Sequence, residues 1–311
     1  MPELRVGERR WSVAPGSNLL DALNSNGEAV PYSCRAGSCH ACLVQCLQGQ
    51  PSDTRPDALS PEQRQQGWRL ACQCQVVEDL QVHTFDPQHD GRPAEVSAID
   101  WLSAHVLRLR LVPQRPLRYS AGQHLVLWAG QVARPYSLAS LPQEDRFLEF
   151  HIDCRQPGAF SDAARLLQIG DSIRLGELRG GALHYDADWH ERPLWLLAAG
   201  TGLGPLFGIL REALLQDHQG SIRVIHLAHD PSEHYLAKPL QAMAATRANL
   251  SIELWTPADL PTTLAQLRLV SRQTQALLCG GPDSVDAFAR RLYLAGLPRN
   301  QLLADAFLPR G

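Results

Sequence analysis

The sequence predicts a multidomain protein with a small β-grasp module, a small antiparallel β-barrel and an α/β domain built on a parallel sheet. A chain of 311 residues exceeds what one hydrophobic core usually holds. Of the eight cysteines, six fall at positions 34 to 74, so the thiols are concentrated in one domain. From about Trp189 the hydrophobic pattern alternates between strand and helix periods, which indicates a parallel sheet covered by helices.

The composition argues against several classes of partner. A net charge of -3 gives no general attraction to nucleic acid or to an anionic membrane, so we expect a small-molecule or protein partner. The uncharged run from Pro193 to Leu210 contains four glycines and two prolines, which favours a strand, a turn and a helix over a membrane span. The N-terminus lacks the apolar segment of a secretory signal, and we expect a cytoplasmic protein with reduced thiols.

Short local signals support the β-grasp module. The run from Leu4 to Val13 alternates and turns at Gly7, as a hairpin does. Residues 17–27 predict a helix with Ser17 as the N-cap and Gly27 just past its end. Ser60 begins a second helix with Pro61 at its first position and a capping box to Gln63, and residues 79–85 return as a strand.

The most specific signal is the loop of sequence CRAGSCHAC. Its cysteines follow C-x4-C-x2-C, and with a distant fourth cysteine this is the plant-type [2Fe-2S] spacing, which makes the predicted ligands Cys34, Cys39, Cys42 and Cys72. Small residues such as Ala36, Gly37 and Ser38 allow backbone N–H groups to approach the cluster. A zinc site usually needs two C-x2-C pairs, and a disulfide framework suits a small secreted chain. Cys46 and Cys74 remain as packed small hydrophobes.

A linker and alternating strands follow. Residues 86–95 are rich in Pro, Gly and charge, and the runs at 106–113 and 124–130 alternate as barrel strands do. Within the barrel, Arg134, Tyr136 and Ser137 offer a cation for phosphate, a ring to stack on a flavin and a hydroxyl near flavin N5. The same residues also suit an ordinary strand end.

Two further motifs point to nucleotides. At Pro157 to Leu167, Gly158 and Ser161 precede a helical run whose N-terminus suits a pyrophosphate, although a plain capped helix would use the same residues. Gly200, Gly202 and Gly204 form a glycine turn between a buried strand and a helix, but depart from G-x-G-x-x-G.

The strands that follow the glycine turn carry two more candidates. Asp230 ends the next strand, where a carboxylate would accept from ribose hydroxyls and repel a 2'-phosphate, which favours NADH over NADPH. It is equally suited to capping the following turn. Cys279 and Gly280 stand at the carboxyl end of a later strand, where open α/β sheets bind ligands.

Together these motifs resemble a known family. Residues 1 to about 85 resemble a plant-type ferredoxin, and the flavin, pyrophosphate, glycine-turn and Cys279-Gly280 motifs occur in the order of the ferredoxin-NAD(P)H reductase superfamily. The whole chain is similar to reductase components of multicomponent oxygenases, of the benzoate dioxygenase reductase type. This resemblance implies a ferredoxin domain at 1–86, an FAD-binding barrel at 94–188 and an NAD(P)H-binding α/β domain at 189–311.

The resemblance also implies roles for single residues. Arg134, Tyr136 and Ser137 would contact FAD, and the segment Gly158, Phe160, Ser161 would bind its pyrophosphate. Thr201 and Cys279 would border the nicotinamide, with Tyr136, Ser137 and Cys279 as the catalytic residues, and Phe307 would lie near the flavin ring. The segment Gly176–Gly181 departs from the family's Gly-Pro-x-Gly. FMN shares the ring and first phosphate with FAD, and the domain order favours FAD.

The domain order predicts an electron-transfer protein. NADH gives two electrons as a hydride, a [2Fe-2S] cluster takes one at a time, and a flavin does both. We expect delivery to an oxygenase component. Alternatives are a non-oxygenase acceptor such as a sugar dehydrase, or a metal-binding interaction module without activity. Arg35, beside a ligand, suits a tuning or docking role, or a solvated surface charge.

Overall fold

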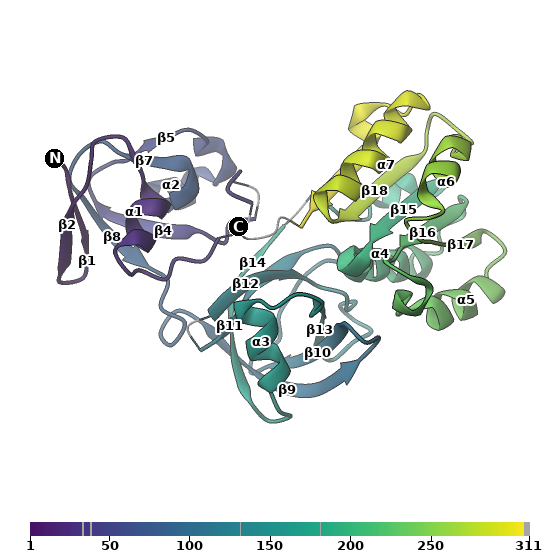
Figure 1. The fold of residues 1–311 in the computed structure, drawn as a ribbon, viewed down its shortest axis with the longest axis horizontal. Coiled ribbons are helices and arrows are strands. Elements are labelled where there is room, and N and C mark those ends of the chain that lie inside the picture. Colours follow the sequence, from purple (N-terminus) through teal and green to yellow (C-terminus); the bar gives the residue numbers. More distant parts are fainter. Residues whose placement is uncertain (33, 38, 131, 181, 308–311) are drawn as a thin grey trace.

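The structure is a computed structural model that describes residues 1–32, 34–37, 39–130, 132–180 and 182–307. Ser38 of the cysteine loop and Gly181 lie outside the described residues. Figure 1 shows a β-grasp module, an antiparallel barrel and an α/β domain as three lobes, which confirms the predicted fold class. Among the described residues, no helix has the length and apolarity needed to cross a membrane.

The N-terminal lobe has a mixed sheet in the order β2-β1-β8-β4-β6, with β1 parallel to β8, and the buried Leu19, Leu20 and Leu23 of α1 belong to its core. Its elements are β1 (Glu3–Val6), β2 (Arg9–Ser12), β3 (Ser17–Asn18), α1 (Leu19–Ser25), β4 (Leu43–Gln48), β5 (Ser52–Asp53), η1 (Pro56–Ala58), α2 (Pro61–Gln65), β6 (Trp68–Leu70), η2 (Ala71–Gln73), β7 (Cys74–Val76) and β8 (Leu80–Thr84).

Most of the local signals in this lobe are confirmed, with one correction. Gly7 turns the β1–β2 hairpin at a φ of 58°, and Ser60 and Gln63 form the capping box of α2. The N-cap of α1 is Asn18, not Ser17. The Asn18 side chain accepts from the Asp21 N–H, whereas Ser17 pairs with Val76 in a small sheet.

The central lobe is a nearly closed barrel in the order β12-β11-β14-β9-β10-β13. The Ala139 N–H donates to the Glu149 carbonyl at 2.9 Å, which joins the two outer strands of that order. Strand β9 begins at Arg92, so it includes residues 92–95, and Gly176–Arg179 continue β14. The elements are β9 (Arg92–Trp101), β10 (Val106–Pro113), β11 (His124–Ala129), β12 (Val132–Ser137), β13 (Leu148–Asp153), α3 (Ala159–Leu166) and β14 (Ser172–Arg179).

The C-terminal lobe is a parallel sheet in the order β17-β16-β15-β18-β19, covered on both faces. Leu196 of β15 packs with α4 and α5 on one face, while Trp195 and Leu197 pack with α6 and α7 on the other, which explains the continuous apolar run. The elements are η3 (Ala187–Trp189), β15 (Leu194–Ala199), η4 (Gly200–Gly202), α4 (Leu203–Leu215), β16 (Ile222–Leu227), η5 (Pro231–Glu233), α5 (Ala237–Ala245), β17 (Leu250–Trp255), α6 (Leu260–Gln266), β18 (Gln275–Gly280), α7 (Pro282–Leu294), η6 (Arg299–Gln301) and β19 (Leu302–Ala306).

The chain order reverses between β15 and β18, because β16 and β17 lie on one side of β15 and the later strands on the other. Such a switch point is where open α/β sheets bind ligands, outside the carboxyl ends of the strands. The barrel closes this end, because Gly204 in the first turn of α4 packs on His151 of β13, where an added Cβ would lie 3.2 Å from His151 Nδ1. The ligand-binding edge of the sheet therefore faces the barrel.

Candidate active site

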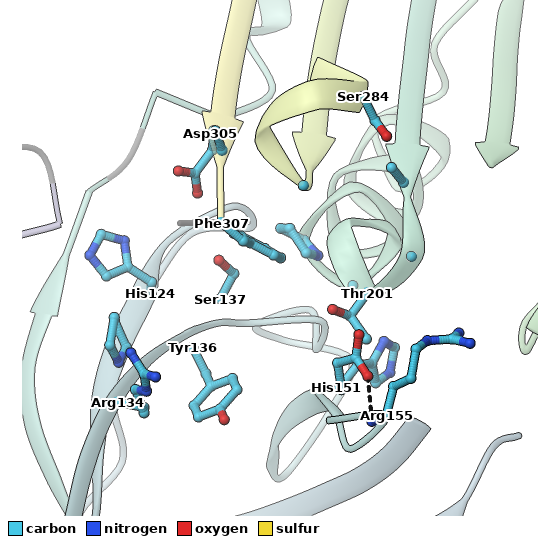
Figure 2. Close-up of a pocket in the computed structure, with 18 of the residues that line it drawn as sticks. His124, Arg134, Tyr136, Ser137, His151, Arg155, Thr201, Ser284, Asp305 and Phe307 are labelled. Atoms are coloured by element: carbon cyan, nitrogen blue, oxygen red, sulfur yellow. Dashed lines mark hydrogen bonds between the residues drawn. The ribbon is translucent and has the colours of Figure 1, made fainter. Parts of the chain in front are cut away.

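A cavity of about 850 Å³ lies where the three lobes meet (Figure 2). This volume is in the range of cofactor sites. Its walls come from the cysteine loop, strand β12, the first turn of α3, the turn after β15 and the end of β19. The predicted site residues that line it are Cys34, Cys39, Arg134, Tyr136, Ser137, Gly158, Phe160, Ser161, Gly200, Thr201 and Phe307. Those that lie outside its lining are Cys42, Cys72, Gly202, Asp230, Cys279 and Gly280.

Strand β12 supplies the side chains predicted to meet a flavin. Pairing with β11 fixes their order, with Ser137 opposite His124 and Tyr136 opposite Leu125. The Tyr136 ring packs on Phe160 with centroids 5.0 Å apart and planes tilted by 47°. Burial raises the pKa of Tyr136, so the phenol stays neutral. The strand thus presents to the cavity a guanidinium, an aromatic ring that is packed on a neighbouring ring, and a hydroxyl.

The first turn of α3 forms another wall. The Ser161 hydroxyl donates to the Gly158 carbonyl at 3.0 Å, and the Gly158 N–H donates to the Asp162 carboxylate at 3.2 Å. Gly158 is the N-cap of α3, and among the described residues no side-chain hydrogen bond caps this end of the helix. Because Gly158, Phe160 and Ser161 line the cavity, the positive end of the helix dipole also faces the space next to β12.

The glycines after β15 serve packing as well as ligand access. Gly200 has a φ of 55° and lines the cavity. A Cβ on Gly202 would lie 2.2 Å from the Cys279 carbonyl oxygen, so this position lets the turn pack directly on β18. A Cβ on Gly204 would lie 3.2 Å from His151 Nδ1 of the barrel. For these two glycines the close approach is to protein.

Cys279 is fully buried at the end of β18 beneath this turn. Burial raises the pKa of its thiol well above the ordinary value, and the nearby Asp305 carboxyl adds to the effect. The thiol is therefore neutral. Gly280 beside it has a φ of 140°, and a Cβ there would lie 2.4 Å from the Ala199 carbonyl oxygen. Both residues support the back of the site.

Asp230 caps the turn that follows β16. Its side chain accepts from the Ser232 N–H at 2.9 Å and from the Ser232 hydroxyl, and these bonds lower the pKa of Asp230. This is the capping role that the sequence allowed. The cavity lining reaches His229, one residue earlier, so the carboxylate stands just beyond the rim.

The cysteine loop fits a binuclear cluster. Its thiols lie in two pairs: Cys34 shares hydrogen bonds with Cys39, and Cys42 shares one with Cys72. The N–H groups of Ala36 and Cys39 donate to the Cys34 sulfur at 3.3 Å. Within the described residues, no three metal-ligating side chains converge as one zinc ion would require. Two thiol pairs with N–H donors suit two irons bridged by sulfides.

Arg35 of the same loop is held by its neighbours. Its guanidinium forms an ion pair at 2.6 Å with Asp21 and lies 4.6 Å from the centre of the Tyr32 ring. The hydrogen bond to Asp21 raises the pKa of Arg35 above its ordinary value. The side chain is half-exposed, so Arg35 is a paired surface charge in this structure.

Some cavity residues were not predicted from the sequence, namely His124, His151, Arg155 and Asp305. Some of the strands that carry them were predicted, but the residues that they contact lie far away in the sequence. His124 starts an alternating run, and its register opposite Ser137 would have followed from pairing Ala129 with Val132. Burial raises the pKa of the Asp305 carboxyl, against an opposing effect from His124.

Family models match three segments of the chain. A 2Fe-2S iron-sulfur cluster binding domain matches residues 5–77, an oxidoreductase FAD-binding domain matches 94–183, and an oxidoreductase NAD-binding domain matches 196–290. These segments follow the three lobes in order. The chain is thus an oxidoreductase with sites for a [2Fe-2S] cluster, FAD and a nicotinamide nucleotide.

Curated relatives cover nearly the whole chain. The ferredoxin--NAD(P)(+) reductase component of the naphthalene 1,2-dioxygenase/salicylate 5-hydroxylase systems of Ralstonia is 32% identical over 315 residues, covering 95% of both chains. The corresponding component of the naphthalene 1,2-dioxygenase system of Pseudomonas putida is 29% identical over 326 residues, covering 99% of this chain and 98% of the relative.

Solved structures agree in fold. A cytochrome P450 reductase of Amycolatopsis matches with a TM-score of 0.66 and 27% identity over 99% of both chains. The ferredoxin reductase in carbazole 1,9a-dioxygenase matches with a TM-score of 0.66 and 23% identity over 99% of this chain and 98% of that one. The arrangement of three lobes therefore recurs over the full length.

Proposed function

This chain belongs to the ferredoxin--NAD(P)(+) reductase components of oxygenase systems, and from that premise we propose that it passes electrons from NADH through FAD and a [2Fe-2S] cluster to an oxygenase component. One observation carries the proposal. The cysteine loop, the flavin strand β12 and the glycine turn after β15 line a single cavity, so the three groups they would bind are neighbours. The acceptor is inferred from the relatives, which serve dioxygenases.

FAD is held by the barrel in this proposal. Bound FAD supplies the exchange between two-electron hydride chemistry and single-electron transfer. Arg134 pairs with a phosphate, Tyr136 stacks on the ring system, and the Ser137 hydroxyl hydrogen-bonds near N5. The first turn of α3 binds the pyrophosphate through Gly158, Phe160 and Ser161. The room beside α3 favours the dinucleotide over FMN.

The nicotinamide nucleotide binds to the α/β domain in this proposal. Gly200 and Thr201 border the nicotinamide at the carboxyl end of β15. Phe307, whose N–H donates to the Gly280 carbonyl at 2.8 Å, lies over the flavin site and excludes water from it. Asp230 discriminates against a 2'-phosphate through its charge. Gly202, Cys279 and Gly280 hold the turn against β18 and shape the wall behind the nicotinamide.

The cluster is bound by the two thiol pairs. Cys34, Cys39, Cys42 and Cys72 would hold the cluster, as two pairs that each share a hydrogen bond. All eight cysteines lie in the described residues and none of them is in a disulfide. Thiols in this state suit assembly in the cytoplasm, where we place the protein.

An anaerobic titration of the purified protein tests the proposal. Substoichiometric NADH should bleach the flavin band and the iron-sulfur band, and NADPH should do so less efficiently. The Cys39→Ser variant should lose iron while NADH still bleaches its flavin, whereas the control Cys46→Ser keeps its iron because Cys46 packs in the module's core outside the ligand set. Bleaching of flavin alone in the wild-type protein would refute the electron route. Reoxidation by an oxygenase component, and not by a sugar dehydrase, would identify the acceptor.

A further inference from the structure

One hydrogen bond connects the barrel to the cysteine loop. Nε2 of His124 lies 3.0 Å from the carbonyl oxygen of Cys39, 85 positions away in the sequence. A carbonyl only accepts, so the His124 ring donates through Nε2–H. His124 is 7% exposed, and the hydrogen bond is partly buried. A hydrogen bond of this kind fixes both the distance and the direction between the two lobes.

The same histidine stands next to the flavin strand. His124 is the first residue of β11 and lies opposite Ser137 of β12 in the antiparallel register. Both side chains line the cavity, and Figure 2 shows them near Phe307 and Asp305. One residue thus contacts the cysteine loop and borders the place assigned to the flavin ring.

Another part of this interface is apolar. Ala41 packs with Val126, Trp128 and Ala133 of the barrel, and Phe85 stacks on Trp128 with centroids 5.4 Å apart. Apolar contact is non-directional, so it holds the lobes together without specifying which cysteine faces the cavity. The His124 bond supplies that specification, because it is made to a single carbonyl.

The two thiol pairs are not equivalent with respect to the cavity. Cys34 and Cys39 line it, and Cys42 and Cys72 do not. Cys42 is buried, with 2% of its surface exposed, within the core of its own module. The Cys34/Cys39 side of the cluster site is therefore the side presented to the flavin site.

Building on the proposed function, we propose that His124 is a positioning residue for electron transfer from the flavin site to the cluster. Its hydrogen bond to the Cys39 carbonyl holds the Cys34/Cys39 pair at the cavity wall, which makes this pair the entry side for electrons. His124 touches neither the nucleotide turn nor the Cys42/Cys72 pair in this role. Its loss affects mainly the second electron-transfer step, because the flavin contacts proposed for β12 come from Arg134, Tyr136 and Ser137.

The test separates the two steps. Wild type, His124→Ala and His124→Gln are mixed anaerobically with NADH in a stopped-flow instrument, and flavin and cluster bleaching are followed separately. His124→Ala should slow cluster bleaching roughly tenfold, the effect of losing one hydrogen bond on a docking equilibrium, and should slow the flavin phase less, because His124 only borders the flavin site. His124→Gln retains an amide donor and should restore most of the rate. The electron paramagnetic resonance signal of the reduced cluster should be the same in all three.

A matched control is available in the same barrel. His105 contacts Glu233 of the α/β domain at 3.7 Å and is absent from the lining of the cavity that Cys34 and Cys39 border, so His105→Ala should leave the cluster phase unchanged. Hydrogen–deuterium exchange gives a readout independent of turnover. The segment 39–43 should exchange faster in His124→Ala than in wild type, His124→Gln or His105→Ala.

The outcomes are distinguishable. Wild-type kinetics together with wild-type exchange in His124→Ala would overturn the inference, as would equal slowing by Ala and Gln. If NADH bleached the flavin but never the cluster of the wild-type protein, the proposed function would fail instead. In that case the exchange of segment 39–43 would still decide whether His124 docks the loop.

Discussion

Nδ1 of His151 lies 3.2 Å from the Tyr235 hydroxyl, and this pair joins the barrel to the α/β domain in the protein interior. The other ring nitrogen, Nε2, lies 3.0 Å from a Glu149 carboxylate oxygen, so Nε2–H donates there and Nδ1 is the atom that bonds to Tyr235. The rings meet edge to face, with centroids 5.2 Å apart. The lobes assigned to FAD and to the nucleotide are therefore connected by a directional contact.

Removing that contact should weaken the junction. In Tyr235→Phe, the buried His151 nitrogen loses its hydrogen-bond partner, and we expect a loss of about 1–2 kcal/mol in the free energy of unfolding. A urea unfolding experiment, monitored by the release of flavin, measures this free energy. The control Tyr293→Phe changes a tyrosine that is 55% exposed and should stay within about 0.5 kcal/mol of wild type. Equal losses in both variants would contradict the assignment.

Glu149 should give the junction a defined acid sensitivity. Burial alone would raise the pKa of Glu149, but hydrogen bonds and charge from His151 and Arg110 outweigh it and lower the pKa from 4.5 to about 2. The folded pKa is lower than the unfolded one, so the stabilisation is complete above pH 4.5 and is lost as the pH falls toward 2. It amounts to roughly 3 kcal/mol.

Replacing this carboxylate should remove the pH dependence. Glu149→Gln should be less stable than wild type at pH 7, and the difference in urea midpoint should shrink as the pH falls below 4.5. Arg108→Gln is the control. Arg108 lies on β10, as Arg110 does, and forms an exposed ion pair with Asp100 of β9, so its loss should give a small difference. A constant gap between Glu149→Gln and wild type from pH 7 to 3 would rule out the shifted carboxylate.

Substitution by alanine should lower stability at one glycine near the nucleotide turn and leave it unchanged at another. In Gly202→Ala the new methyl group would meet the Cys279 carbonyl oxygen at 2.2 Å, so the turn must move away from β18, at a cost of about 1–3 kcal/mol. At Gly281 nothing lies within 4 Å and φ is -63°, so Gly281→Ala should melt like wild type. Differential scanning calorimetry measures the melting temperature of both variants. Equal melting temperatures would refute close packing at Gly202.

The charge of Asp230 is separable from its capping role. Asp230→Asn keeps an oxygen for the Ser232 N–H and removes the charge, so the turn should persist. We expect the ratio of kcat/KM for NADPH over NADH to rise roughly tenfold, because repulsion of the 2'-phosphate is lost. Asp217→Asn, an exposed aspartate after α4, controls for net charge. An unchanged ratio would mean that Asp230 only caps the turn.

What the sequence predicted well is local. The capping box at Ser60, the hairpin glycine at Gly7 and the strand–turn–helix at Gly200 each depend on residues a few positions apart. Asn18 displaced Ser17 as a cap because a tertiary pairing with Val76 decided between two competent residues. His124 and His151 were not predicted, since each bonds to a residue more than eighty positions away.

The α/β domain shows the same limit. The family resemblance implied that Cys279 borders the nicotinamide, and its predicted place at the carboxyl end of a strand is confirmed in β18. Its burial depends on how closely the turn at Gly202 approaches β18, and a glycine in the sequence does not say which backbone it approaches. Predicting the exposure of Cys279 therefore required the packed structure.

The connection between the first two lobes is short. Strand β8 ends at Thr84 and β9 begins at Arg92, and Phe85 at its start is stacked on Trp128. A tether of this length keeps the ferredoxin lobe at an effective concentration on the order of millimolar around the barrel. Electron supply to the cluster is then a unimolecular process, insensitive to dilution of the protein. A separate ferredoxin would have to reach a comparable concentration in the cell before it could compete for the same face of the barrel.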